Sequence, residues 1–202
     1  MIDYVKDPIF KQKVRVAEVT LPAFPYICIK GKGNPNCQDF ASRVHALYTM
    51  AYAIKMSPNK GMKIPGFEPF KVFPLEGIWD MTQHGRQCDV FDKNELIYTI
   101  MIRQPEFVTQ EVFNNALAIV KKKNTNSLLN ETFFDIIEDG HCVQTLHKGS
   151  FDEEPHSFDL MKLYIKQNGM ERRSFDHREI YLSDVRKTPP EKLRTILRYF
   201  LK

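Results

Sequence analysis

The chain shows the same order of segments, a strand, a helix and two strands, once in each half. In the first half, residues 26–32 are predicted to form a strand that ends in a Gly-Lys-Gly turn. Apolar residues spaced along one face predict a helix over residues 39–56. Residues 69–80 and 95–103 then have the composition of a strand pair. The repeated order predicts an α+β fold built from two related modules.

The second half repeats this order from residue 141 onward. A strand over residues 141–149 is followed by a helix over residues 155–168. Pro155 fits the first turn of that helix, and Gly169 follows its predicted end. The next strand surrounds Glu179 and is rich in Ile, Tyr and Leu.

The last segment of the chain carries two conflicting signals. Residues 188–191, Thr-Pro-Pro-Glu, form a capping-box sequence that predicts a helix start. Thr195, Leu197 and Tyr199 alternate with their neighbours and would share one face of a strand. Because a strand closes the first half, we expect one helical turn followed by a strand.

Two further segments complete the plan. Residues 95–103 are largely apolar at both alternating sets of positions, which predicts a central strand covered on both sides. Between the halves, residues 109–123 carry apolar residues at helical spacing, and residues 124–131 form a mostly polar linker. The sequence therefore predicts two strand–helix–strand–strand modules joined by a helix.

Composition excludes several classes of protein. The chain has 202 residues, of which 43% are hydrophobic and 27% charged, as in ordinary globular proteins. No apolar run approaches the ~20 residues of a membrane-spanning helix. Acidic residues and a proline occupy residues 1–8, where a signal peptide would be apolar. We therefore expect a cytoplasmic protein that does not contact the membrane.

The cysteines indicate neither a metal site nor a disulfide, and the charge does not indicate a nucleic-acid partner. The four cysteines are scattered and include no CxxC pair, so we expect reduced thiols: Cys28, Cys37, Cys88 and Cys142. The net charge of +4 is too small to imply a nucleic-acid partner. The six histidines show no metal-ligand spacing, and His147 and His177 are expected to be core or surface groups. We expect no metal and no cofactor.

Glu179 is the residue that points most directly to a site. In a strand around it, Glu179, Tyr181 and Ser183 would face one way and Ile180 and Leu182 the other. A carboxylate beside an aromatic ring on one face of a sheet is costly to bury unless a cation, a hydrogen bond or a ligand compensates. The alternative is a half-exposed strand with Glu179 in water.

Six segments in a fixed order carry a family resemblance, and together they cover about residues 20–202: residues 24–36, 47–57, 74–79, 107–109, 147–155 and 178–195. This ordered set resembles the GyrI-like small-molecule-binding family, the effector-binding domain of multidrug-responsive and AraC-type bacterial regulators. The resemblance is to the free-standing branch of the family, since the chain has no residues to spare for a DNA-binding domain.

The resemblance implies a fold in which the two modules pair with pseudo-two-fold symmetry. Their strands would form a curved antiparallel sheet around a ligand cleft. The expected organisation is a lead segment at residues 1–22 and a single domain at residues 23–202. Within that domain, module one spans about 23–104, the connecting helix about 108–123, and module two about 133–202.

Carboxylates and aromatic rings make up the candidate site. The candidates for catalysis are Glu154 and Glu179, and those for ligand binding are Glu153, Trp79, Tyr52, Tyr48, Phe151 and Tyr181. Whether Glu153 or Glu154 faces the cleft is open, because Glu154 could instead favour the helix N-terminus by its charge. Trp79 could equally be a core residue. The face of Glu76 cannot be fixed, because Gly77 makes its strand irregular.

Such a site suits two kinds of function. A carboxylate among aromatic rings attracts a lipophilic cation, so the protein could bind lipophilic, often cationic or planar xenobiotics, as in multidrug binding. Two carboxyl groups with different pKa values can also support hydrolysis without a metal or a covalent nucleophile. Some free-standing members of the family hydrolyse the strained cyclopropane of DNA-alkylating natural products, and the resemblance implies Glu154 (or Glu153) and Glu179 as the corresponding pair.

A third function is inhibition of DNA gyrase, which the resemblance associates with one branch of the family. The modest net charge of +4 offers this role little support. The partner we expect is a small lipophilic ligand. The sequence does not define an oligomeric state, and we expect a monomer.

Overall fold

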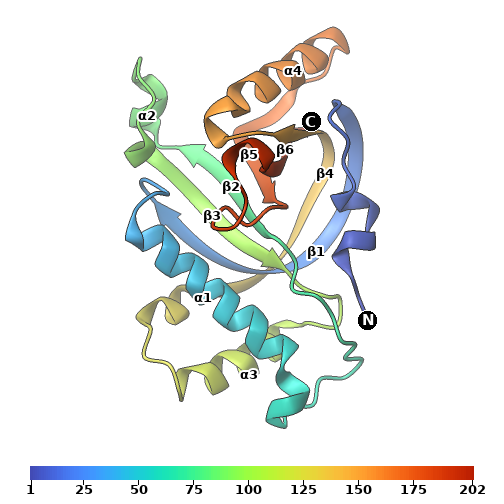
Figure 1. Cartoon of the computed structure of the whole chain (residues 1–202), viewed down its shortest axis with the longest axis vertical. Coiled ribbons are helices and arrows are strands. Elements are labelled where there is room, and N and C mark those ends of the chain that lie inside the picture. The colour runs from blue at the N-terminus through green and yellow to red at the C-terminus, as the bar shows by residue number, and fades with distance from the viewer. The chain divides into compact units, whose positions relative to one another are not determined.

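A computed structural model describes residues 1–202, except for the side chain of Lys60. Its helices and strands follow in this order (Figure 1): β1 (Ala17–Lys32), α1 (Gln38–Lys55), β2 (Leu75–Met81), α2 (Gln83–Gln87), β3 (Leu96–Arg103), α3 (Gln110–Lys121), β4 (Phe133–Lys148), α4 (Glu154–Gln167), β5 (Arg172–Tyr181) and β6 (Arg194–Leu201). Short 3₁₀ turns lie at Tyr4–Lys6, Pro8–Phe10, Ser57–Lys60, Lys93–Glu95, Ser127–Glu131, Phe151–Glu153 and Pro190–Lys192.

The predicted α+β class and the repeated order of segments are confirmed. The order β1, α1, β2, β3 recurs as β4, α4, β5, β6, with α3 between them. The single helical turn and final strand expected at the end of the chain are present as Pro190–Lys192 and β6. The short helix α2 was not predicted; Thr82 begins it by accepting a hydrogen bond from the backbone of Gly85.

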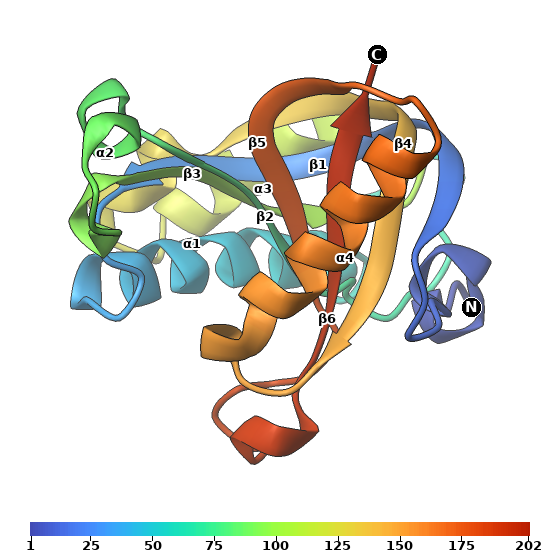
Figure 2. The ribbon, with the colours of Figure 1, turned by 90° about the horizontal axis from the view of Figure 1, so that it is seen from above.

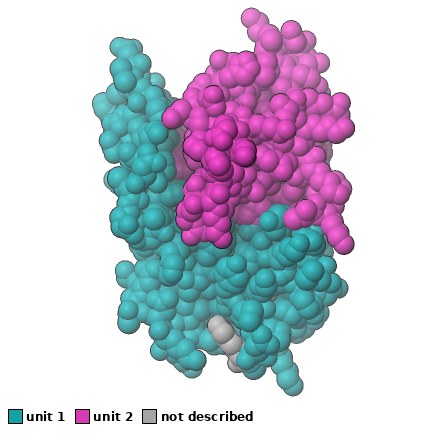
Figure 3. Space-filling model, in the orientation of Figure 1, with its two compact units in different colours: residues 1–4, 24–73, 81–137 teal, residues 5–23, 74–80, 138–202 magenta. Residues whose placement is uncertain are grey.

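The chain is divided into two compact units (Figure 3). Unit 1 contains residues 1–4, 24–73 and 81–137, and unit 2 contains residues 5–23, 74–80 and 138–202. Unit 2 therefore includes most of β2, which belongs to the first half of the sequence. The predicted lead segment, the module boundaries and the ligand cleft stay predictions.

The strands of each unit pair in an antiparallel manner. In unit 1, Tyr26–Lys32 of β1 pairs with β3. In unit 2, β5 lies between β2 and β6, and β6 pairs with the second half of β4. The register of β5 shifts between Arg172 and His177, and the strand bends strongly there (Figure 2).

Two strands are longer than predicted. β1 begins at Ala17 rather than at residue 26, and β4 begins at Phe133 rather than at residue 141. The first parts of both strands are largely exposed or half-buried, so they lack the apolar run from which the prediction was made. β2 is shorter than predicted, because the residues before Leu75 include prolines and form no strand ladder.

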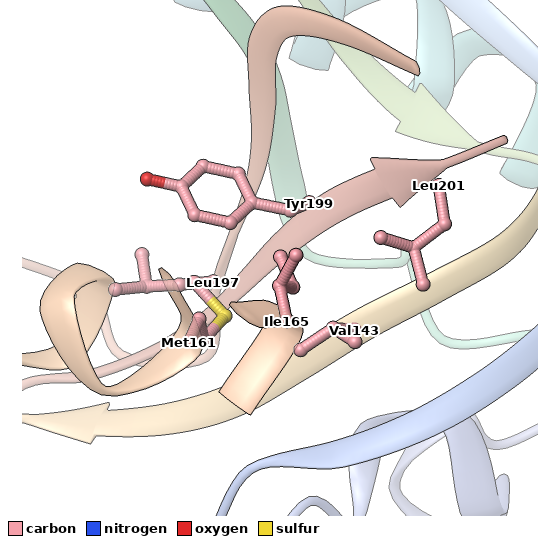
Figure 4. Close-up of a cluster of buried hydrophobic side chains, with 6 residues drawn as sticks. All are labelled: Val143, Met161, Ile165, Leu197, Tyr199 and Leu201. Atoms are coloured by element: carbon pink, nitrogen blue, oxygen red, sulfur yellow. The ribbon is translucent and has the colours of Figure 1, made fainter. Parts of the chain in front are cut away.

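The cores of the two units show why the apolar spacing predicted the elements. In unit 1, Leu47, Ala51 and Ile54 of α1 are buried, and Ile100–Ile102 of β3 is buried on both faces. In unit 2, α4 packs on β4 and β6 through a cluster shown in Figure 4: Val143, Met161, Ile165, Leu197, Tyr199 and Leu201. Among the described residues, no helix has both the length and the apolar character needed to cross a membrane.

Candidate functional site

One face of β5 carries the centre of the candidate site. His177, Glu179 and Tyr181 alternate along the strand and are joined by hydrogen bonds. The Tyr181 hydroxyl donates to Oε2 of Glu179 at 2.7 Å, and Nε2 of His177 lies 2.9 Å from Oε1. The predicted sharing of a face by Glu179 and Tyr181 is confirmed. Both oxygens of the Glu179 carboxylate are held by donors, although its side chain remains 12% exposed.

Tyr181 links this carboxylate to the first half of the chain. The indole Nε1–H of Trp79, on β2, donates to the Tyr181 oxygen at 2.8 Å. Burial raises the pKa of Tyr181 well above its usual value, and the negative charge of Glu179 adds to the shift. Tyr181 is therefore a neutral donor at physiological pH.

Glu154 stands at the first residue of α4 and is almost completely buried. It is 6% exposed, and its Oε1 has no hydrogen-bond partner among the described residues. Burial raises the pKa of Glu154 to about 10, and the negative charges of Glu179 and Asp152 contribute. The side chain is therefore neutral at pH 7, with a proton that it can donate.

Glu153, the adjacent residue, is exposed and has a different role. Its Oε2 accepts hydrogen bonds from the backbone N–H of Ser150 at 3.1 Å and from the Ser150 hydroxyl at 3.2 Å. These contacts close a capping box at the start of the turn that leads into α4. Of the two adjacent glutamates, Glu154 is thus the one with electrostatic contact to Glu179 and Tyr181.

Aromatic rings pack on the two side chains that hold the Glu179 carboxylate, Tyr181 and His177. Phe151 is 40% exposed and meets Tyr181 edge to face, with ring centroids 5.9 Å apart. Phe158 packs in the same way on His177, with a centroid distance of 4.7 Å. Trp79 is only 5% exposed, so in this structure its ring is part of the core of unit 2.

Tyr48 and Tyr52 lie on α1 in unit 1. Their rings are 6.4 Å apart, and Tyr52 is half exposed. Their proposed contact with a ligand stays a prediction.

The contact of His177 with Glu179 was not predicted from the sequence. The signal was its position two residues before Glu179, which places both side chains on one strand face. His147, by contrast, is a satisfied core histidine, as expected. Its Nε2–H donates to the backbone oxygen of Ser150 at 2.9 Å, and its Nδ1 lies 2.9 Å from the hydroxyl oxygen of Ser157.

Glu76 lies in a buried ionic network rather than with Glu179. Arg178, on the other face of β5, binds Glu76 at 2.8 Å and Asp139 at 2.7 Å. Arg198 of β6 also pairs with Asp139 and donates to Gln144 of β4 at 2.9 Å. The sequence offered no sign of this network, because its members come from four strands far apart in the chain.

The chemistry of the site rests on carboxyl groups. Among the described residues, no cluster of three or more His, Cys, Asp or Glu side chains could hold a metal ion. A buried neutral carboxyl beside a carboxylate can donate a proton on one side of a reaction and accept one on the other.

Comparison with known proteins identifies the family. Residues 15–200 match the family described as the GyrI-like small molecule binding domain. The chain belongs to this family. Comparison of this GyrI-like chain with curated proteins found no match.

Solved structures agree with the family. A hydrolase from Listeria innocua is 32% identical, with a TM-score of 0.90 and 100% of each chain covered. An uncharacterized conserved protein from Listeria innocua is 33% identical, with a TM-score of 0.92 over the same full coverage. The EcmrR C-terminal domain is 13% identical, with a TM-score of 0.55 over 93% of this chain and 97% of that one, and it shares the fold.

Proposed function

We propose that this GyrI-like domain hydrolyses a small lipophilic molecule without a cofactor, with Glu154 as proton donor and Glu179 as proton acceptor. The observation that carries the proposal is the buried Oε1 of Glu154, which has no hydrogen-bond partner among the described residues and belongs to a carboxyl group that stays neutral at pH 7. An unsatisfied buried polar group costs stability, and active sites are a common place for that cost.

The proposed substrate is a molecule with a strained cyclopropane ring conjugated to a carbonyl group. Glu154 protonates the carbonyl oxygen as a cyclopropane C–C bond breaks and its electron pair moves into the conjugated system. A water molecule attacks the ring carbon that is released, a C–O bond forms, and the proton lost by the water goes to Glu179. One water is consumed, the product is a ring-opened alcohol, and a proton must return from Glu179 to Glu154 before the next cycle.

Two further findings support hydrolysis. The Listeria innocua protein described as a hydrolase matches this chain over its full length at 32% identity. The sequence also resembles the free-standing members of the family that open cyclopropanes. The capping role of Glu153 favours Glu154 as the partner of Glu179.

The test is turnover of a cyclopropane-bearing DNA alkylator, followed by mass spectrometry of the ring-opened alcohol. Glu154→Gln and Glu179→Gln should each lower the rate on the order of 10²–10⁴-fold. Glu171→Gln, which alters an exposed glutamate paired with Lys202, is the matched control and should keep the wild-type rate. Unchanged turnover in both site variants would remove the glutamate pair from the mechanism.

Binding without chemistry is the second candidate. It is favoured by the partly exposed Glu179 carboxylate and the 40% exposed ring of Phe151, which together suit a lipophilic cation. Saturable binding of the alkylator with no product from wild type would favour this function over hydrolysis.

A further inference from the structure

We propose that Gly77 and Trp79 are positioning residues for Glu179. Gly77 leaves the space in which the Trp79 indole lies, and the indole N–H fixes the direction of the hydrogen bond from Tyr181 to Glu179. The effect on turnover rests on the proposed hydrolysis, whereas the hydrogen-bond chain can be tested without any substrate.

Gly77 is required at its position for reasons of space. It lies directly opposite Glu179 in the register of β2 and β5, as Trp79 lies opposite His177. A Cβ atom at Gly77 would stand 2.5 Å from Nε1 and 3.1 Å from Cε2 of Trp79. The first distance is shorter than real Cβ contacts, so any other residue here must displace the indole. The glycine therefore allows the ring to lie over its own strand.

The chemistry of the indole gives the chain of hydrogen bonds one direction. An indole nitrogen donates and cannot accept, so the Tyr181 oxygen is the acceptor in its contact with Trp79. The single hydroxyl proton of Tyr181 then points to Oε2 of Glu179, which accepts it. Without the indole N–H, the Tyr181 hydroxyl could rotate and donate elsewhere.

This direction matters for Glu179 because both oxygens of its carboxylate are then held by hydrogen-bond donors. Tyr181 holds Oε2, and His177 holds Oε1. A base that is already held in its reactive orientation needs no free energy to reach that orientation during the reaction. This is the advantage of a preorganised site. Trp79 thus acts on Glu179 through Tyr181, a role that differs from the ligand-binding one predicted from sequence.

The indole itself provides the test, because Trp79 is the only tryptophan of the chain. Its single indole N–H resonance can be followed by ¹H–¹⁵N NMR in wild type, Gly77→Ala and Tyr181→Phe. Tyr181→Phe removes one oxygen and keeps the ring, so it should not prevent folding. Ile78→Val, on the same strand but not in the chain of hydrogen bonds, is the control for general disturbance of β2.

In wild type, the resonance should lie downfield and exchange slowly with solvent. Both Gly77→Ala and Tyr181→Phe should move it upfield and speed its exchange, and Ile78→Val should leave it in place. Identical shifts and exchange rates in wild type and Tyr181→Phe would show that the indole does not donate to Tyr181, and would overturn the inference. An unchanged resonance in Gly77→Ala would show that Gly77 has no part in positioning the indole.

A double-mutant cycle on turnover tests the effect on Glu179. Gly77→Ala should lower kcat roughly 10- to 100-fold with little change in KM, since misplacement of a catalytic group has effects of this size. In a Trp79→Leu background, Gly77→Ala should cause no further loss, because the indole it displaces is absent. Equal losses of kcat in both backgrounds would mean that Gly77→Ala acts by disturbing β2 and not by displacing the indole. No turnover by wild type would refute the proposed hydrolysis, and the NMR spectra would then decide the positioning role by themselves.

Discussion

Glu153, Glu154 and Glu179 carry the same side chain, and their surroundings give each a separate role. Glu153 accepts hydrogen bonds from Ser150 and caps a turn. Glu179 accepts from Tyr181 and His177 and remains partly exposed. Glu154 is buried, and desolvation outweighs the favourable position of a negative charge at a helix N-terminus. Local environment, rather than residue type, therefore separates the proposed proton donor from the proposed acceptor.

The raised pKa of Glu154 predicts a particular dependence of stability on pH. In the native state Glu154 keeps its proton up to a pKa of about 10, whereas in the unfolded chain it releases the proton near its ordinary pKa. Its contribution to stability is therefore complete below the unfolded pKa and is lost as pH rises through the folded pKa. The free energy of unfolding of wild type relative to Glu154→Gln should fall with pH, by at most about 1.4 kcal/mol per pH unit.

Urea denaturation of both proteins between pH 5 and pH 9 measures this difference. Comparing the two proteins cancels the titration of groups that do not interact with Glu154. A difference that stays constant across this range would show that Glu154 ionises normally and that burial does not raise its pKa.

At the level of single elements, β5 separates two chemical environments by its alternation. His177, Glu179 and Tyr181 face the candidate site, whereas Arg178 and Ile180 face the interior of unit 2. Burial raises the pKa of Glu76 despite its ion pair with Arg178. Burial also acts to raise the pKa of Asp139, but the charges of Arg178 and Arg198 outweigh it and lower that pKa. The network ties β2, β4, β5 and β6 together behind Glu179.

Removal of one charge from this network should be costly. Asp139→Asn leaves two buried guanidinium groups with one carboxyl partner, so we expect a loss of about 3–5 kcal/mol in the free energy of unfolding. The same substitution at Asp159, in an exposed pair with Lys162, is the matched control and should cost about 0–1 kcal/mol. Equal losses at the two positions in chemical denaturation would mean that the buried network does not stabilise the sheet.

At the scale of the whole molecule, the order of elements could be predicted and the contacts between distant ones could not. Apolar spacing and capping signals depend on neighbouring residues, and they located the repeated strand–helix–strand–strand order and the final turn and strand. Strand alternation also placed Glu179 and Tyr181 on one face. The contacts of Trp79 with Tyr181 and of Asp139 with Arg178 join residues far apart in the chain, so no local pattern encodes them.

The same limit explains what the sequence left open. Strand alternation places His177 on the same face as Glu179, but the hydrogen bond between them depends on side-chain geometry. Glu76 could not be placed because Gly77 hides the alternation of β2, and its position follows only from the pairing with β5. The assignment of β2 to unit 2 likewise follows from strand pairing and not from sequence order.

A cationic ligand should stabilise the molecule more than a neutral or anionic one at the same concentration, because it pairs with the Glu179 carboxylate. At 100 times its dissociation constant, a planar lipophilic cation should add about 2.7 kcal/mol of stability and raise Tm by roughly 5–10 °C. Glu179→Gln should lose most of this shift, because it removes the carboxylate that pairs with the cation. A thermal-shift series of cationic, neutral and anionic analogues of one shape measures the effect. Equal shifts for all three analogues, in both proteins, would contradict binding through Glu179.

Glu154 should hold a proton at neutral pH, because burial and the negative charge of Glu179 raise its pKa. Infrared difference spectroscopy of wild type against Glu154→Gln at pH 7 tests it most directly, since a protonated carboxylic acid and a carboxylate absorb at different frequencies. We predict that wild type shows a carbonyl band of a neutral carboxylic acid and that this band is absent from Glu154→Gln. A difference spectrum that contains only carboxylate bands would show Glu154 to be ionised, and would contradict its proposed role as the proton donor.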